Sequence, residues 1–348
     1  MADMTIATLT DLLKENYGQL FIDLVVREGE GNWLVPEQTF LGRLRRHGKV
    51  FIGGADGSNR YAREWGLKVA GKTASSFGIN DAYPVAEAVT YDDASIAWKR
   101  TGEMVAADNL ARLTTGRASM RDAIPALNKD MADAFMAIID DLDTQLAGDG
   151  TGNDSKDIDG FAAFLSTANT YAGIAQGAQA LWQANIVAGG AAALTNTMMR
   201  TMVRNAWNRN ALGPNTEIWM DLLQFQKFST LHADNIRYQP NTEVGAPKPF
   251  YADGAHAIPI HVVQGVPTSE VHMFNMDDLE YRMLDHNPED EASAMSDLSI
   301  VKEGVPFGLE AVQSGKDSKQ FFLKVYSNLV CVNPYRQSAI TNLATTAP

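Results

Sequence analysis

The residues with the spacing best suited to chemistry form an octapeptide, GLKVAGKT, at residues 66–73. It satisfies the pattern G-x-x-x-x-G-K-[ST], in which loop amides and a lysine hold phosphates between a buried strand and a helix. Here the segment before the octapeptide is charged, and the segment after it, ASSFGINDAYP, contains a glycine and a proline that break a helix. We therefore interpret the octapeptide as part of a glycine-rich hairpin. A P-loop nucleotide hydrolase that binds phosphate through Lys72 is kept as an alternative.

A second segment, DGTGNDSKDIDG at residues 149–160, has alternating side-chain oxygens of the kind that bind calcium. A calcium loop needs glycine at its sixth position and glutamate at its twelfth, where this chain has Asp154 and Gly160. Both mismatches favour a polar turn that follows a helix.

Three aspartates, Asp140, Asp141 and Asp143, lie just before this turn, at the end of a predicted helix. They could bind a metal, but a solvated or partner-facing helix end is the commoner use of such a cluster. Negative charge at the C-terminal end of an exposed helix costs about 0.3–1 kcal/mol per group, which indicates a basic partner. The candidates, on the same or a neighbouring chain, are the arginines of LGRLRRHGK: Arg43, Arg45 and Arg46.

No further arrangement of residues in the sequence indicates catalysis. His256 and His261 would point to opposite faces of a strand, which makes them poor joint ligands. The patterns H-E-x-x-H and G-x-S-x-G are absent. Cys331 is the only cysteine, so a disulfide within the chain and a cysteine-rich zinc site are excluded. We predict no catalytic residue, no cofactor and no bound metal, and we predict that the protein is not an enzyme.

The composition is that of a soluble, acidic globular protein. The 348 residues include 29 Lys and Arg against 42 Asp and Glu, which gives a formal net charge of −13. Proteins that hold nucleic acid by neutralising phosphates show the opposite balance, so any contact with DNA is expected to be local or limited to enclosing it. No apolar run is long enough to span a membrane, and charges among the first twenty residues argue against a signal peptide. With a single cysteine, the chain is expected in a reducing cytosol at synthesis.

The elements that would position these residues begin with a helix and a hairpin. Apolar residues at helical spacing over residues 13–25 follow a capping threonine, Thr8 or Thr10. From residue 50 to about residue 90, glycines punctuate short polar segments such as RYAREWGLKV, which alternates in the manner of a strand. We predict a long polar β-hairpin with its tip near residues 70–76. Such a hairpin is too poor in large apolar residues to be stable alone, and the sequence suggests no partner for it within the chain.

The strongest helical signal follows the hairpin. Apolar residues recur three or four positions apart at Leu127, Met131, Phe135, Ile138, Leu142 and Leu146. Pro125 suits the first turn of this helix, and Gly148 suits its end. We also predict a strand at 95–100, helices at 103–113, 195–208 and 221–233, and strands at 217–220, 257–263, 271–275 and 279–284. The last strong element, FFLKVYSNLVCVNP at 321–334, is a strand long enough to cross two substructures.

The order of these elements resembles that of tailed-bacteriophage major capsid proteins with the Hong Kong 97-type fold. LDTQLAGDGTG, residues 142–152, is similar to the end of the family's spine helix and the turn into its axial lobe. VTYDDASIAWKRTGEMVA, residues 89–106, is similar to the stretch after the family's extended loop. KVYSNLVCVNP, residues 324–334, is similar to its closing strand. The resemblance covers nearly the whole chain and rests on the order of features.

The resemblance implies an α+β fold in four parts. These are an N-terminal arm with a helix (1–49), an extended hairpin loop (50–89), a peripheral domain with the spine helix (90–158 and 316–348) and an axial α/β domain (159–315). The extended loop of such proteins lies across a neighbouring subunit, which would give the hairpin its missing partner. We therefore predict contacts between subunits through three residues of the arm and three of the hairpin: Arg43, Arg45, Arg46, Arg60, Trp65 and Lys72.

The resemblance also implies a function and partners. Subunits of this family form hexamers and pentamers of an icosahedral head around double-stranded DNA, so a place in the virion, after assembly in the host cytoplasm, is expected. Because the arm begins almost at Met1, we expect a separate scaffold protein or none, together with portal and possible decoration proteins. An encapsulin-type nanocompartment shell, which stores a cargo enzyme, is the alternative within the same fold.

Overall fold

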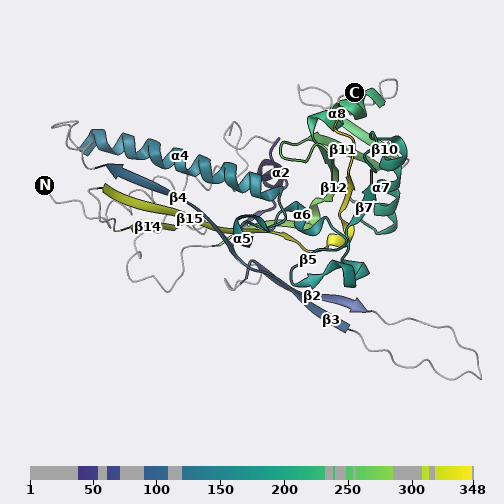
Figure 1. The fold of residues 1–348 in the computed structure, drawn as a ribbon, viewed down its shortest axis with the longest axis horizontal. Helices are drawn as coiled ribbons and strands as arrows, with labels where there is room; N and C mark the ends of the chain where they lie inside the picture. Colours follow the sequence, from purple (N-terminus) through teal and green to yellow (C-terminus); the bar gives the residue numbers. More distant parts are fainter. Residues whose placement is uncertain are drawn as a thin grey trace, which may run out of the picture.

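The computed structural model describes residues 38–53, 61–70, 90–108, 120–231, 238–239, 248–253, 256–284, 308–312 and 318–346. The predicted helix over residues 13–25 and the predicted hairpin tip lie outside these ranges. Figure 1 shows an elongated molecule, with a long helix beside one sheet at one end and a second sheet flanked by helices at the other. None of the helices in the described ranges is long and apolar enough to cross a membrane.

A five-stranded sheet is built around one long strand near the C-terminus. Its strands are β1 (Val50–Ile52), β4 (Lys99–Asp108), β13 (Leu279–Met283), β14 (Gly308–Val312) and β15 (Ser318–Cys331). Strand β15 pairs with β4 along ten residues, with β14 through its first half and with β13 through its second half. The predicted terminal strand is therefore confirmed, and it joins segments that are far apart in the sequence.

The predicted spine helix is α4 (Met120–Leu146), which lies along β4 (Figure 1). The described part of its apolar stripe is buried: Phe135, Ile138, Leu142 and Leu146. The helix ends before Gly148, as expected, because Gly148 N donates to Gln145 O in a closing turn. The expected start was wrong, since the helix begins five residues before Pro125.

One predicted helix is a strand. Residues 103–108 belong to β4, which pairs with β15 from Lys99 to Asp108. The segment EMVAAD adopts an extended conformation because the pairing with β15 supplies its backbone hydrogen bonds. Tertiary context of this kind overrides a weak local preference for helix. The predicted strand at 95–100 is likewise divided between the end of β3 (Thr90–Ile96) and the start of β4.

The second sheet has seven strands in the order β7-β16-β12-β8-β11-β10-β9. Their bounds are β7 (Asn185–Ala188), β8 (Thr216–Met220), β9 (Tyr238–Gln239), β10 (Lys248–Asp253), β11 (His256–Val262), β12 (Val271–Asn275) and β16 (Ser338–Thr341). Helices α7 (Asn196–Asn208) and α8 (Leu222–Leu231) accompany it, close to their predicted positions. Thr195 caps α7, since its side chain accepts from Met198 N.

Short elements complete the described chain. They are α2 (Phe40–Arg46), the helical turns α5 (Gly152–Ser155) and α6 (Phe161–Phe164), β5 (Thr170–Tyr171), β6 (Ile174–Ala175), and the 3-10 turns η1 (Gln176–Ala178), η2 (Ala180–Trp182), η3 (Met276–Asp278) and η5 (Pro334–Arg336). Helix α2 lies within the basic segment, and its buried residues include two arginines besides the apolar ones: Phe40, Leu41, Gly42, Arg43, Leu44 and Arg45.

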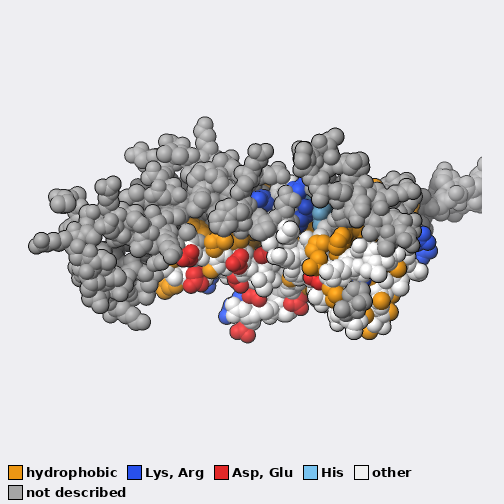
Figure 2. All heavy atoms as spheres, turned by 90° about the horizontal axis from the view of Figure 1, so that it is seen from above, with side chains coloured by type: hydrophobic (Ala, Val, Ile, Leu, Met, Phe, Trp, Pro, Cys, Tyr) orange, Lys and Arg blue, Asp and Glu red, His pale blue; other side chains and the backbone are white. Residues whose placement is uncertain are grey.

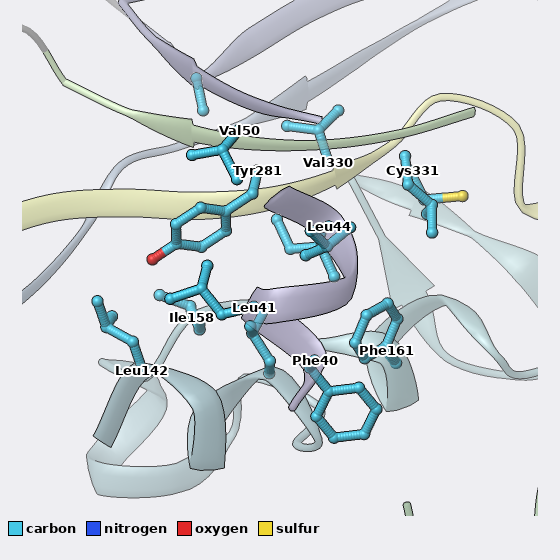
Figure 3. Packing of buried hydrophobic residues seen from close by; sticks show 14 of the residues in the cluster. Phe40, Leu41, Leu44, Val50, Leu142, Ile158, Phe161, Tyr281, Val330 and Cys331 are labelled. Atoms are coloured by element: carbon cyan, nitrogen blue, oxygen red, sulfur yellow. The ribbon is translucent and has the colours of Figure 1, made fainter. Parts of the chain in front are cut away.

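Helix α2 sits at the centre of the larger of two hydrophobic clusters. Figure 3 shows Leu41 and Leu44 among residues of α4, β13 and β15, with Phe40 beside Phe161. The rings of Phe40 and Phe161 are 4.8 Å apart, and Phe161 also packs against Phe274 of β12 at 4.7 Å. Because this aromatic group reaches both sheets, it joins the two ends of the molecule in one core. The smaller cluster lies between the seven-stranded sheet and the two helices α7 and α8.

Candidate functional site

The base of the predicted hairpin is a two-stranded antiparallel ribbon of β2 (Arg63–Ala70) and β3 (Thr90–Ile96). Arg63 pairs with Ile96, and Ala70 pairs with Thr90, with a register shift between Lys68 and Ala70. Figure 1 shows the ribbon leaving the body of the molecule on the side of β5. Strand β1, at the start of the predicted hairpin segment, instead pairs in parallel with β13.

The ribbon is anchored to the core of its own subunit. Ala62, Ala94 and Ile96 are buried in the larger cluster, and Trp65 packs against it with its ring 6.1 Å from that of Trp182. The expectation that the hairpin has no partner within the chain was therefore wrong for its base. Sequence reasoning missed this because the partner, Trp182, lies more than a hundred residues away.

Ion pairs hold the same base. Glu280 of β13 accepts hydrogen bonds from Arg63 of the ribbon and from Arg282, the latter with its Nε at 2.8 Å. Burial would raise the pKa of Glu280, but these two guanidinium groups hold it below its ordinary value. Arg282 also lies over the ring of Phe51, at 5.1 Å, and donates to Gly53 O at 3.1 Å. The root of the ribbon is thus fixed to the five-stranded sheet by charge as well as by packing.

Arg43, one of the six predicted contact residues, is part of a buried charge cluster. It is 2% exposed and pairs with Glu217 of β8, which is 5% exposed. The imidazole nitrogens His47 Nε2 and His261 Nε2 lie 2.9 and 3.3 Å from the same carboxylate oxygen of Glu217. Trp219 Nε1 donates to the other carboxylate oxygen at 2.9 Å.

This cluster explains how a charged helix packs on an apolar sheet. Burial would raise the pKa of Glu217, but the hydrogen bonds of His261 and His47 and the charge of Arg43 lower it well below its ordinary value. Glu217 therefore stays ionised and ties α2 to the seven-stranded sheet. A signal was present in the sequence, because a glutamate inside the apolar strand TEIWM requires a buried partner.

The other predicted contact residues are placed as follows. Arg45 is buried and Arg46 is partly buried on α2, Trp65 is partly buried on β2, and Arg60 and Lys72 lie outside the described residues. No neighbouring subunit is present, so a role at a subunit interface stays a prediction for all six.

One of the three aspartates contacts the backbone of α2, whereas Arg43, one of the expected arginine partners, pairs with Glu217. Leu41 N, at the start of α2, donates to Asp143 Oδ1 at 2.9 Å. Burial raises the pKa of Asp143 to about 6, although backbone N–H groups of Leu41 and Phe40 lower it. Asp140 and Asp141 are exposed on α4.

Two segments resemble ligand-binding motifs, the octapeptide at residues 66–73 and the acidic turn at residues 149–160. Residues 66–70 of the octapeptide form part of an antiparallel ribbon, whereas residues 71–73 lie outside the described ranges. In the acidic turn, Asp149 accepts from Thr151 N at 3.0 Å and Asp159 accepts from Asn328 at 2.8 Å. Within the described ranges, no group of three or more His, Cys, Asp or Glu is arranged to hold a metal ion.

Two solved capsid structures align with the chain along most of its length. A chain of the cyanophage A-1(L) capsid aligns with a TM-score of 0.59 and 19% identity, over 81% of this chain and 88% of that chain. The capsid of a native GTA particle aligns with a TM-score of 0.51 and 15% identity, over 91% of this chain and 98% of that chain. The holo-SrpI encapsulin complex from Synechococcus elongatus PCC 7942 aligns with a TM-score of 0.49 and 10% identity, over 92% of this chain and 91% of that chain.

These likenesses confirm the α+β, Hong Kong 97-type fold. No curated protein sequence matches the chain. The model of one family, the SU10 major capsid protein, matches residues 101–305, which is more than half of the chain. The chain therefore belongs to the SU10 major capsid protein family, and it is a phage major capsid protein, a structural subunit of the shell of the virion.

Proposed function

We propose that this subunit assembles as hexamers and pentamers into an icosahedral head that encloses double-stranded DNA, and that its hairpin lies across a neighbouring subunit. One observation supports the proposed position of the hairpin across a neighbour. The β2–β3 ribbon is packed at its base and then leaves the body of the molecule (Figure 1). A two-stranded ribbon is marginally stable by itself, so its outer part needs a surface to lie on. A neighbouring copy of the chain is the surface that a closed shell supplies.

We propose the same four parts as predicted, although some strands of one part pair with strands of another. Strand β13 falls within the predicted axial segment (159–315) but pairs with β15, and β16 falls within the terminal segment (316–348) but pairs with β7 and β12. The chain thus crosses between the two sheets more than once. Such crossings favour a rigid subunit over two independently moving domains.

We propose that the subunit binds other copies of itself, a portal, a separate scaffold and decoration proteins. We also propose that the subunit has no catalytic activity. The formal net charge of −13 supports enclosing DNA without sequence-specific binding, because release of the genome requires weak attachment to phosphates. The family match favours this reading over an encapsulin-type shell and over a P-loop hydrolase.

Within the hairpin and arm, we propose that Arg60, Trp65, Lys72 and Arg46 contact a neighbouring subunit. Arg43 and Arg45 are buried in the subunit, and they would support the interface by holding α2 in place.

The test is a shortened hairpin that keeps the anchored base. Because Ala70 and Thr90 are paired, residues 71–89 can be replaced by Asn-Gly, which forms a two-residue turn between antiparallel strands. The variant should have the far-UV spectrum and melting temperature of the parent chain, but it should form no closed shells by sedimentation and negative-stain microscopy. A control that keeps the length and replaces residues 71–89 by their shuffled sequence separates length from specific contacts. Normal shells from the shortened chain would refute the role of the hairpin.

A further inference from the structure

Helix α7 carries a basic stripe on its solvent face. Its inward face is Met199, Met202, Val203 and Ala206, which are buried against the seven-stranded sheet. On the opposite face, Arg200 and Arg204 are exposed one turn apart, and Trp207 follows on the same side with 60% of its surface exposed. We call these three residues the α7 stripe.

The α7 stripe stands out from the rest of the surface. Among the residues whose side chains the structure describes, the only other exposed Lys and Arg are Arg100 and Lys156, and exposed carboxylates outnumber all four. Within that same part, neither Arg200 nor Arg204 forms an ion pair. Tryptophan and arginine are the residues most enriched at the centres of protein interfaces, so this combination fits a docking surface.

Helix α4 carries a complementary acidic stripe. Asp133 and Asp140 are exposed on the face opposite to the buried Phe135 and Leu142, and Asp141 is exposed on the flank next to them. We call these three aspartates the α4 stripe. Asp140 and Asp141 lie near the C-terminal end of the helix, where negative charge is unfavourable without a cation nearby. Figure 2 shows Asp and Glu side chains gathered near the middle of one face of the molecule.

Within one subunit the two stripes do not pair with each other, since no ion pair among the described residues joins Arg200 or Arg204 to an aspartate of α4. Helix α4 lies along the five-stranded sheet, with its C-terminal end beside α2, whereas α7 flanks the seven-stranded sheet (Figure 1). Two different complementary surfaces on one chain are what a head-to-tail contact needs, and repeated head-to-tail contacts related by rotation close into rings.

We propose that the α7 stripe of one subunit docks on the α4 stripe of a second copy of this chain. The proposal rests on the proposed assembly into rings and shells, and it names surfaces for that contact outside the hairpin. The arginines pair with the aspartates, and Trp207 supplies the apolar centre of the contact.

The experiment compares the full-length parent chain with Arg200→Glu/Arg204→Glu, with Asp140→Lys/Asp141→Lys, and with the chain that carries all four changes. Like charges facing each other across an interface oppose association, so each double variant should lose at least about tenfold in the yield of rings and shells. The fourfold variant restores opposite charges and should recover the parent yield. Arg100→Glu/Lys156→Glu, which changes the net charge by the same amount as the first variant, is the control and should assemble normally. Far-UV spectra and melting temperatures verify that every variant is folded.

The outcomes are distinguishable. A fourfold variant that stays as defective as the double variants would overturn the pairing of the two stripes, as would normal shells from Arg200→Glu/Arg204→Glu; in both cases the parent shells would leave the proposed function intact. If reversing the arginines leaves shells normal and weakens binding of the purified chain to duplex DNA, the α7 stripe faces nucleic acid and the proposal fails. A parent chain that forms neither rings nor shells at any concentration or salt would contradict the proposed function itself.

Discussion

Neutralising Glu217 tests whether one buried carboxylate joins α2 to the seven-stranded sheet. In Glu217→Gln the side chain keeps its shape and an oxygen for Trp219 Nε1, but the guanidinium of Arg43 loses its counter-charge. Arg43 is 2% exposed, and its Nε already lacks a hydrogen-bond partner among the described residues. Removing one partner of a buried ion pair costs about 3–5 kcal/mol because the other charge stays buried and unpaired. We expect the lower end, about 3 kcal/mol, because the amide oxygen still accepts a hydrogen bond.

A second variant separates the contribution of the Arg43–Glu217 ion pair from the effect of changing the two side chains. Arg43→Met/Glu217→Gln removes both charges and fills similar volume, and such replacements are commonly close to neutral. The double variant should therefore be more stable than Glu217→Gln by at least about 2 kcal/mol. A double-mutant cycle that also includes Arg43→Met alone then gives the coupling between the two residues.

The pH dependence gives an independent reading of the same cluster. Because folding lowers the pKa of Glu217 from its ordinary 4.5, the carboxylate stabilises the folded state above that pH, and the contribution declines as the pH falls further below it. The assay is urea unfolding of the unassembled subunit, followed by far-UV circular dichroism at pH 7 and at pH 4 and below. The parent should lose stability in acid faster than Glu217→Gln does. Additive effects of the two substitutions, or identical acid sensitivity of parent and variant, would refute the reasoning.

Two further substitutions test other features of the structure. Because burial raises the pKa of Asp143 to about 6 from 3.8, the group favours folding below pH 4 and this contribution is lost as the pH rises through 6. Asp143→Asn, whose amide oxygen can still accept from Leu41 N, should raise the free energy of unfolding at pH 7 by about 1–3 kcal/mol and change it little at pH 4; an equal gain at both pH values in urea titrations would contradict this. A Cβ at Gly160 would lie 2.4–2.6 Å from the carbonyl oxygens of Gln145, Leu146 and Gly148. Gly160→Ala should therefore lower the melting temperature of the subunit, at a cost of about 1–3 kcal/mol, whereas Gly213→Ala, with its nearest neighbour at 3.7 Å, serves as the control.

The elements that could be predicted are those whose signal is local. The stripe from Phe135 to Leu146 predicts α4 because 3.6-residue periodicity places those side chains on one buried face. Thr195 predicts the start of α7 because its side chain caps the first turn. The expected helix at residues 103–108 failed for the opposite reason, since its conformation depends on β15, more than two hundred residues further along.

The surroundings of the candidate contact residues could be predicted only in part, for a related reason. A run of arginines indicates that charge must be balanced, but the sequence cannot say whether the balance comes from Asp140, from a neighbour or from Glu217. The structure pairs Arg43 with Glu217, 174 residues away. The sequence places Arg200, Arg204 and Trp207 at i, i+4 and i+7. Whether these side chains are exposed depends on which face of the helix packs on the sheet.

By itself, the sequence determined the acidic charge, the spine helix, the long terminal strand and the order of parts that resembles a capsid subunit, because composition, periodicity and element order belong to the chain alone. Only the tertiary structure decided that the hairpin is anchored by Trp182 and Glu280, that Arg43 is buried, and that the basic and acidic stripes lie on helices that flank different sheets. These features depend on contacts between distant segments, and such contacts are selected by the packing of the whole core rather than by any local preference.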